Sequence, residues 1–320
     1  MDHRTDQSHR RLAVATCTEA ADTDADEDSP LLLAALDHAG IDTTLAVWDD
    51  DSVDWAAFDL VVIRSTWDYA LRRDEFVQWA QRVESVTSLR NPASVIGWNT
   101  DKRYLADLAA DGVAVTRTEF LLPDGVIDAA AAADRIRSAI DPGSQFVVKP
   151  TVSAGSKDTV RYAAVDDDRS AFDSAASHAA ALLAAGRAVM VQPYLSAVDD
   201  EGETGLVFLG GDFSHAFRKG PLLSVGGEPV TELFMQESIS PRVATDAQLA
   251  VAERAIASAR ARTGADLLYA RVDLLPDGDG NPVVLELELT EPSFFLDTSD
   301  GAPERAAAAI ASAIPALSRG

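Results

Sequence analysis

A hairpin near the C-terminus constrains the fold of this chain most. Segments 267–275 and 282–289 are apolar runs typical of buried strands. The turn at 277–281, which contains two Asp-Gly steps, favours a tight connection between them. Acidic residues interrupt both runs, in the sequences RVD and LELE, and the leucines around them argue against a wholly exposed sheet. We therefore expect acidic side chains on a partly buried sheet.

The spacing of these acidic residues predicts a metal site. Side chains alternate along a strand, so Glu286 and Glu288 share one face, with Asp273 facing them from the other strand. Arg271 has the same parity as Asp273 and points to the same side. Three carboxylates repel one another unless cations neutralise them, and Mg²⁺ prefers oxygen ligands. We predict that Asp273, Glu286 and Glu288 bind metal; the alternative is a solvated acidic face.

A second hairpin, at 146–162, is predicted to cover a phosphate chain. Its first strand, 146–148, delivers Lys149 at its end, and a short turn containing Ser153, Gly155 and Ser156 leads to a strand at 159–163. Such a loop can present backbone N–H groups and hydroxyls to phosphate while the lysine supplies the opposite charge. The alternative is an ordinary hairpin with a surface lysine.

Lys102 is a further candidate for phosphate binding. Asn99 or Thr100 is predicted to cap a helix that extends to Leu108, which places Lys102 in its first turn. A cation near the positive end of the helix dipole is unfavourable, so we expect an anion beside it. Asp101 or a nucleotide phosphate could be this anion.

The first hundred residues alternate strands and helices, which predicts an open parallel α/β lobe. Strands are expected at 12–17, 43–48 and 58–63, helices at 31–38 and 72–83, and a solvated loop at 19–28. Ligands gather at the carboxyl ends of such strands. The residues after the third strand are therefore candidates for substrate binding: Arg64, Thr66, Trp67 and Asp68. The alternative is a capping loop with Trp67 and Tyr69 in the core.

Two further segments suit ligand contacts. The extended segment after the strand 188–192 includes Gln192, Tyr194 and Leu195 and could pair with an adenine edge, although most such segments are connectors. Arg218 and Lys219 leave a hairpin together and could hold a phosphoryl group or a substrate carboxylate. Local charge balance is the alternative.

Composition limits the partners and the compartment. The 320 residues are 47% hydrophobic, enough for two or three lobes. With 52 Asp and Glu against 27 Lys and Arg, the net charge of −25 argues against nucleic acid and anionic membranes and fits a high-salt cytoplasm. Cys17 is the one cysteine, so no intrachain disulfide forms, and a buried small hydrophobe is the expected role. Without a signal-peptide pattern or an apolar run of ~18 residues, we expect a cytoplasmic protein.

Taken together, the order of these motifs resembles the ATP-grasp superfamily of carboxylate–amine ligases over nearly the whole chain. The resemblance implies an α/β fold, with α+β character in the ATP-binding lobes. It implies three lobes: an open parallel α/β substrate lobe at 1–98, a central lobe with the phosphate lid at 99–192, and a C-terminal lobe with the Mg²⁺ site at 193–320. ATP would lie between the last two lobes.

The resemblance also implies roles for single residues. Lys102 of NTDKRYL looks like the family's first phosphate-binding lysine, and Lys149 of FVVKP looks like the second. The loop SAGS looks like the phosphate cover, and VMVQPYL looks like the adenine hinge, with Glu203 on the ribose. Arg271 would contact the transferred phosphoryl group. The carboxylates would hold two Mg²⁺ ions, or Mn²⁺; many family members have Asn in place of Glu288.

A closer likeness, in RSTWDY, KPTVSAGSKDT, SHAFRKGPL and LELELTEPSFF, is to the branch that contains the D-cycloserine-forming ligase and relatives with glutathione-synthetase-type ATP domains. It implies a ligase that activates a small carboxylate as an acylphosphate and joins it to an amine, with release of ADP and phosphate. Substrates would be small molecules, and the chain could form a homodimer. The alternatives are a non-catalytic ATP sensor and a small-molecule kinase.

Overall fold

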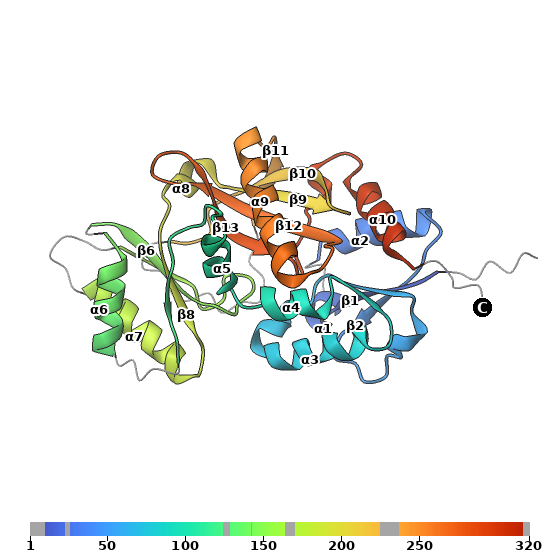
Figure 1. Cartoon of the computed structure of the whole chain (residues 1–320), viewed down its shortest axis with the longest axis horizontal. Helices are drawn as coiled ribbons and strands as arrows, with labels where there is room; N and C mark the ends of the chain where they lie inside the picture. The colour runs from blue at the N-terminus through green and yellow to red at the C-terminus, as the bar shows by residue number, and fades with distance from the viewer. Residues whose placement is uncertain are drawn as a thin grey trace, which may run out of the picture.

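The computed structural model describes residues 10–22, 26–123, 129–141, 143–163, 170–224 and 237–315. Within these residues the strands form three sheets, which follow one another along the chain (Figure 1). The first sheet is parallel and the other two are antiparallel. This confirms the predicted α/β class with α+β character in the later lobes. The polar residues 1–9, where we expect no signal peptide, lie outside the described part.

The N-terminal sheet has the strand order β2-β1-β3-β4, all parallel. Every residue of β3 is buried, as a strand covered on both faces should be. On one side its core contains Trp48, Phe76 and Trp79, whose rings pack within 6 Å of one another. The elements are β1 (Arg11–Thr16), α1 (Thr18–Asp22), α2 (Asp28–His38), β2 (Asp42–Val47), the 3₁₀ helix η1 (Trp55–Ala57), β3 (Leu60–Ile63), the 3₁₀ helix η2 (Trp67–Leu71), α3 (Arg73–Glu84) and β4 (Ser88–Arg90).

The central sheet has the order β5-β8-β6-β7. Helices α6 and α7 pack against each other at the outer end of the molecule, and their alanine and leucine residues form one hydrophobic cluster with the sheet (Figure 1). The elements are β5 (Glu119–Leu121), α6 (Ala129–Ala139), β6 (Gln145–Pro150), β7 (Val160–Ala163), α7 (Ser170–Ala184) and β8 (Val189–Pro193).

The C-terminal sheet has the order β11-β10-β9-β12-β13. The predicted hairpin is confirmed: β12 and β13 are antiparallel neighbours with Asp273 opposite Glu286 and Arg271 opposite Glu288. The elements are α8 (Ala197–Glu201), β9 (Glu203–Leu209), β10 (Asp212–Lys219), β11 (Ile239–Arg242), α9 (Asp246–Thr263), β12 (Tyr269–Pro276), β13 (Pro282–Glu288), the 3₁₀ helix η3 (Leu296–Thr298) and α10 (Ala302–Ala313).

Two helices, α4 (Ala93–Asn99) and α5 (Tyr104–Ala110), pack with α9 against the C-terminal sheet, in a cluster that also includes Met190 of β8. At the other end, α10 packs on α2 of the N-terminal lobe, and the two lobes share a hydrophobic cluster. The lobes are thus joined by buried apolar surface on both sides of the C-terminal sheet. The lobe boundaries at 98 and 192 stay a prediction.

Two local predictions are wrong. Residues 18–22 form helix α1, and Asp28, expected in a solvated loop, is 5% exposed because it caps backbone groups of a distant loop. Lys102 does not lie in a first helical turn, since α4 ends at Asn99 and α5 begins at Tyr104. Asn99 binds β13 instead of capping a helix: its side chain donates to Leu287 O at 2.8 Å and accepts from Leu289 N at 2.7 Å.

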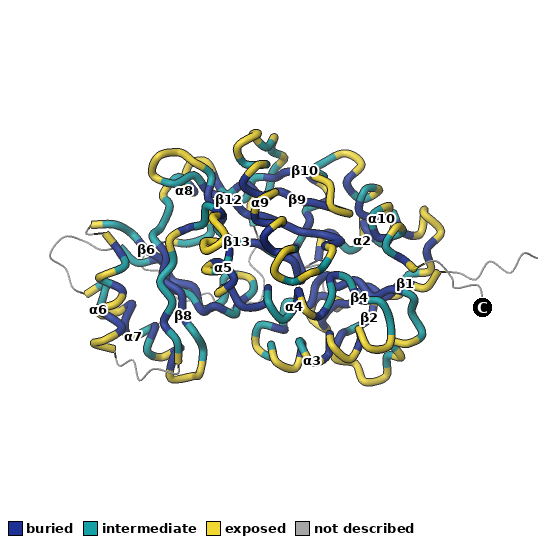
Figure 2. The backbone as a smooth tube through the Cα atoms, viewed as in Figure 1, coloured by how far each residue is buried: buried dark blue, intermediate teal, exposed yellow. Residues whose placement is uncertain are grey.

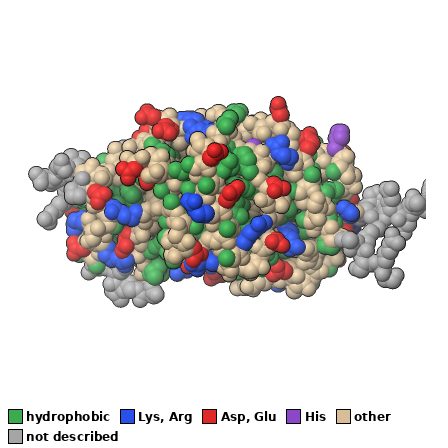
Figure 3. All heavy atoms as spheres, turned by 45° about the horizontal axis from the view of Figure 1, so that its top comes forward, with side chains coloured by type: hydrophobic (Ala, Val, Ile, Leu, Met, Phe, Trp, Pro, Cys, Tyr) green, Lys and Arg blue, Asp and Glu red, His purple; other side chains and the backbone are tan. Residues whose placement is uncertain are grey.

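Burial follows the sheets, whose inner strands are largely buried, while the edge strands β2 and β11 and the outer faces of the helices are more exposed (Figure 2). Cys17 is buried, as expected. On the face in Figure 3, acidic and basic side chains are interspersed among apolar ones. Among the described residues, no helix is long and apolar enough to cross a membrane.

Candidate active site

A cavity of about 520 Å³ receives lining residues from all three lobes. The central sheet contributes Lys149 and the end of β8, and the C-terminal sheet contributes β12 and β13. The N-terminal lobe contributes Trp67 and Tyr69 from η2. A site built by three separate lobes is the usual location for a bound small molecule.

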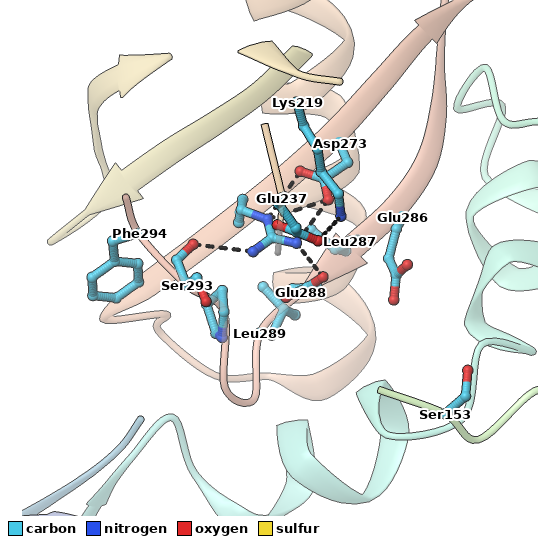
Figure 4. Close-up of polar contacts among 12 residues, drawn as sticks. Ser153, Lys219, Glu237, Asp273, Glu286, Leu287, Glu288, Leu289, Ser293 and Phe294 are labelled. Carbon is cyan, nitrogen blue, oxygen red and sulfur yellow. Dashed lines mark hydrogen bonds and ion pairs between the residues drawn. The ribbon is translucent and has the colours of Figure 1, made fainter. Parts of the chain in front are cut away.

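Arg271 is the centre of a buried ion-pair network on the cavity wall formed by β12 and β13. Figure 4 labels its partners Asp273, Glu288 and Ser293. Arg271 Nε donates to Asp273 Oδ1 at 3.0 Å, and its Nη2 donates to Asp273 Oδ2 at 2.9 Å and to Glu288. The remaining Nη1 donates to the carbonyl oxygen of Ser293 at 3.0 Å. Because these contacts fix the whole fork of the guanidinium, the side chain is held in one orientation.

Lys102, in the connection between α4 and α5, contacts a carboxylate of β13. Its Nζ lies 2.9 Å from Glu286 Oε1 and donates to the carbonyl oxygen of Ser153 at 2.8 Å. Its backbone N–H donates to Thr151 O at 2.8 Å. Lys102 therefore connects the predicted phosphate loop to the carboxylate strand, and the predicted neighbouring anion is Glu286 and not Asp101, which pairs with Arg103.

Lys149 lines the cavity without an ion pair to any described residue. Burial lowers the pKa of this amine, while Glu286 opposes the shift and Lys102 adds to it. An anion would stabilise the charged form of this lysine, since a phosphate would supply the ion-pair partner that the described residues do not provide.

The two glutamates of β13 differ in their environments. Burial favours the neutral form of both, but Lys102 and Lys149 outweigh it at Glu286 and lower its pKa. At Glu288, burial raises the pKa in spite of Arg271, and the neighbouring carboxylates Glu286 and Asp273 add to the shift. The wall therefore carries more acidic groups than its own cations neutralise, as a site for a divalent cation should.

As the side chains lie, no group of three His, Cys, Asp or Glu in the described residues is arranged to hold a metal ion. The reason is local: the guanidinium of Arg271 lies against both Asp273 and Glu288, and Lys102 holds Glu286. The donors are nonetheless carboxylate oxygens on one sheet face that lines the cavity, which is the chemistry Mg²⁺ takes. The metal assignment stays a prediction.

A second group of charges lies beside Arg271. Lys219 is 2.8 Å from Glu237, and both line the cavity with Glu203. Burial raises the pKa of Glu203 to about 7, and Asp273 adds to the shift, while Lys219 and Lys149 oppose it.

The predicted lid and hinge both line the cavity. Ser153, Gly155 and Ser156 are among its lining residues, and the last two have φ of 60°. Gln192, Tyr194 and Leu195 of the predicted hinge also line it. Gln192 is fixed by a hydrogen bond of 2.9 Å from its Nε2 to Thr118, and the Tyr194 ring lies 3.5 Å from the Arg161 guanidinium carbon.

Four predicted site residues do not line the cavity. Arg64 is 2% exposed and donates to Pro292 O at 2.7 Å, and Thr66 is buried beside it in sequence. Asp68 accepts from Trp48 Nε1 at 2.8 Å, so it supports the aromatic core. Arg218 donates to the carbonyl oxygen of Glu201 at 2.8 Å, because alternation along β10 turns it away from Lys219. Of the RSTWDY segment, only Trp67 and Tyr69 reach the cavity.

Sequence reasoning missed several lining residues: Asp28, Asn99, Glu237 and Glu291. Glu291 follows β13 by three residues, inside the segment LELELTEPSFF, and is 9% exposed. An acidic residue three positions after two alternating glutamates was a usable signal. Asp28 gave none, because the backbone N–H groups that it accepts lie more than 260 residues away.

Comparison with known proteins identifies the family. The family model described as the N-terminal domain of D-cycloserine synthetase DcsG matches residues 12–91. The cycloserine biosynthesis protein DcsG of Streptomyces lavendulae is 42% identical over 301 residues, 93% of this chain and 97% of that protein. The crystal structure of D-cycloserine synthetase DcsG has a TM-score of 0.85 at 41% identity and covers 95% of this chain and all of its own.

A D-alanine–D-alanine ligase from Bacillus anthracis, solved with ATP, shares the fold, with a TM-score of 0.64 at 15% identity over 95% of this chain and 96% of that one. The predicted resemblance and the enzyme class are confirmed. The chain belongs to the DcsG family of ATP-grasp carbon–nitrogen ligases.

Proposed function

We propose that this chain uses ATP to activate the carboxylate of a small amino acid and to close an amide bond onto a nitrogen of the same molecule. The observation that carries the proposal is the cavity wall where Arg271, Lys102 and Lys149 meet the carboxylates of β12 and β13. The relative with 42% identity is named for cycloserine biosynthesis. Cycloserine is a five-membered ring in which the acyl carbon is bonded to a side-chain nitrogen of the same amino acid.

ATP would enter with its adenine at Gln192, Tyr194 and Leu195 and its ribose at Glu203. Its phosphates would meet Lys149, Lys102 and the backbone of the Ser153–Ser156 loop. The environment of the lysines supports this orientation, because Lys102 is buried, Lys149 is partly buried without an ion pair to the described residues, and a phosphate would replace the water that they have lost.

Phosphoryl transfer requires charge neutralisation more than covalent chemistry. Asp273, Glu286 and Glu288 would hold Mg²⁺, which would neutralise negative charge on the phosphates. Arg271 and Lys219 stabilise the charge that develops on the moving phosphoryl group. The substrate carboxylate attacks the γ-phosphorus, ADP leaves, and an acylphosphate forms.

The second step forms the amide. The nitrogen attacks the acyl carbon, the carbon–oxygen bond to phosphate breaks, and inorganic phosphate leaves. The SAGS loop and the aromatic residues Trp67, Tyr69 and Phe295 line the cavity. Closure of the loop over ATP would protect the acylphosphate from water.

Phosphate release with mass analysis of the product tests the proposal. Candidate substrates are O-amino-D-serine, its L-enantiomer, and D-alanine paired with a free amine. A product that has lost one water from O-amino-D-serine, with one ADP per ring, is the expected result. A phosphorylated substrate would indicate a kinase, nucleotide binding without turnover would indicate a sensor, and a linear amide would exclude ring closure as the main reaction.

Several expectations stay predictions from the sequence: two Mg²⁺ ions or Mn²⁺, a homodimer, a cytoplasmic location, a high-salt habitat, and the absence of nucleic-acid and membrane partners. Size-exclusion chromatography with light scattering tests the homodimer.

A further inference from the structure

Glu291 is a buried carboxylate of the cavity that the steps above do not use. It lies three residues after β13 and is 9% exposed, and it lines the cavity with Tyr69 and Trp67 of the N-terminal lobe. It therefore sits where residues of the substrate lobe meet the phosphoryl-transfer wall.

The backbone around Glu291 is fixed. Tyr269 donates from its hydroxyl to the carbonyl oxygen of Thr290 at 2.9 Å, and Leu289 N donates to Asn99 Oδ1 at 2.7 Å. Both contacts are buried. The side chain therefore starts from a rigid position, which a group acting directly on a substrate requires.

Glu291 makes no ion pair with the described residues. The Tyr69 side chain lines the cavity with it, burial raises the pKa of the Tyr69 hydroxyl, and this hydroxyl lowers the pKa of Glu291. The nearest lysine, Lys102, is engaged by Glu286 at 2.9 Å. The carboxylate thus keeps a lone pair for a group in the cavity, in contrast to Glu286 and Glu288, which are held by cations.

The charged environment also suits proton transfer. Burial raises the pKa of Glu291 to about 7, with Lys102 and Tyr69 opposing the shift. The titratable and charged groups around it are Tyr69 from η2, Lys102 from the α4–α5 connection, Arg271 from β12, and Glu286 and Glu288 from β13. A base whose pKa lies near the working pH is the most effective one.

We propose that Glu291 accepts the proton of the nitrogen nucleophile in the amide-forming step and that Tyr69 is its positioning residue. The inference rests on the proposed function. As the nitrogen bonds to the acyl carbon and phosphate leaves, the proton on nitrogen passes to a Glu291 carboxylate oxygen. It returns to water after the product leaves. Glu291 has no part in forming the acylphosphate, so the two half-reactions depend on it differently.

Two assays separate the half-reactions. O-Methyl-D-serine carries the carboxylate but no side-chain nitrogen, so the acylphosphate formed from it is trapped by added hydroxylamine as a coloured hydroxamate. O-Amino-D-serine reports ring closure. In Glu291→Gln, hydroxamate formation should stay within about threefold of wild type, and ring closure should fall by about 10²- to 10⁴-fold.

Further variants distinguish proton transfer from structural damage. Glu291→Asp keeps a carboxylate, so its rate of ring closure should be at least about tenfold higher than that of Glu291→Gln. Tyr69→Phe should slow ring closure while sparing hydroxamate formation. Glu253→Gln makes the same change at an exposed position of α9 and should alter neither assay.

The outcomes are distinct. Equal loss of both half-reactions in Glu291→Gln, or unchanged ring closure, would overturn the role of Glu291 and leave the proposed function standing. Wild-type protein that is inactive in both assays would overturn the proposed function and the inference with it. If Glu291→Gln melts at a much lower temperature than wild type, Glu291→Asp decides the test. Failure of Glu291→Asp to recover ring closure then counts against the proposal.

Discussion

Replacing Asp28 should destabilise the protein more than its position in an acidic surface segment suggests. Asp28 is 5% exposed and accepts the backbone N–H groups of Phe294, Phe295 and Leu296, the last two at 3.1 and 2.7 Å. It also lies 3.3 Å from Arg64 Nη2. Asp28 thus joins the N-terminal lobe to the loop that follows β13.

The expected cost follows from these contacts. Asp28→Ala leaves the Arg64 guanidinium buried without a counter-charge, a loss of about 3 to 5 kcal/mol. Each buried N–H left without an acceptor costs about 1 to 3 kcal/mol, part of which is already counted in the first figure. We expect the free energy of unfolding to fall by about 4 kcal/mol or more. Asp28→Asn keeps an oxygen acceptor and should cost about half as much.

Urea unfolding followed by tryptophan fluorescence measures this change. Asp37→Ala, at an exposed position of the same helix α2, is the matched control and should change stability by less than about 0.5 kcal/mol. If Asp28→Ala costs less than about 1 kcal/mol, the reasoning is refuted. It is also refuted if Asp28→Ala and Arg64→Met are additive, because removing both partners of a buried pair should cost less than the sum.

Three shorter predictions test the site and its surroundings. Glu286→Gln should abolish substrate-dependent ADP release, since it removes the partner of Lys102 and a predicted Mg²⁺ ligand; retained turnover would contradict the assignment. Gly155→Val should slow turnover, because φ of 60° disfavours a β-branched residue in the predicted lid, and unchanged kinetics would count against a lid. Burial lowers the pKa of His215 in the fold, so the unfolded chain binds its proton first and stability should fall as pH drops below about 6.5. His215→Gln should remove this part of the pH dependence of urea unfolding, and an unchanged slope would contradict it.

The sequence predicts those parts of the site whose geometry is local. Alternation along two strands joined by a short turn fixes which side chains share a face. The sequence pattern therefore places Asp273, Glu286 and Glu288 on one face of the sheet. The same holds for Lys149, which leaves the end of a strand next to a Gly/Ser turn. In both cases the determining contacts lie within about twenty residues of one another.

Contacts between lobes could not be predicted in this way. Arg64 follows a parallel strand, where a ligand residue is expected, yet it is buried against a loop more than 220 residues later in the chain. Asn99 has the sequence signature of a helix cap, yet its amide pairs with the backbone of β13. A cap and a strand contact use the same donor and acceptor, so local pattern cannot choose between them.

Competition between cations explains why the predicted metal ligands are engaged by basic side chains. Arg271 occupies both Asp273 and Glu288, while the phosphoryl role proposed for it needs a free guanidinium face. A phosphate bound to Arg271 would release the carboxylates for Mg²⁺, and Mg²⁺ bound to the carboxylates would release Arg271 for phosphate. The binding of either one should therefore raise the affinity for the other. Glu288→Gln releases one of these pairs. Calorimetric titration should then find metal-free ADP bound more tightly than by wild type, and the gain in ADP affinity on adding Mg²⁺ should shrink by about fivefold or more. An unchanged gain would mean that Arg271 and the metal do not compete for these carboxylates.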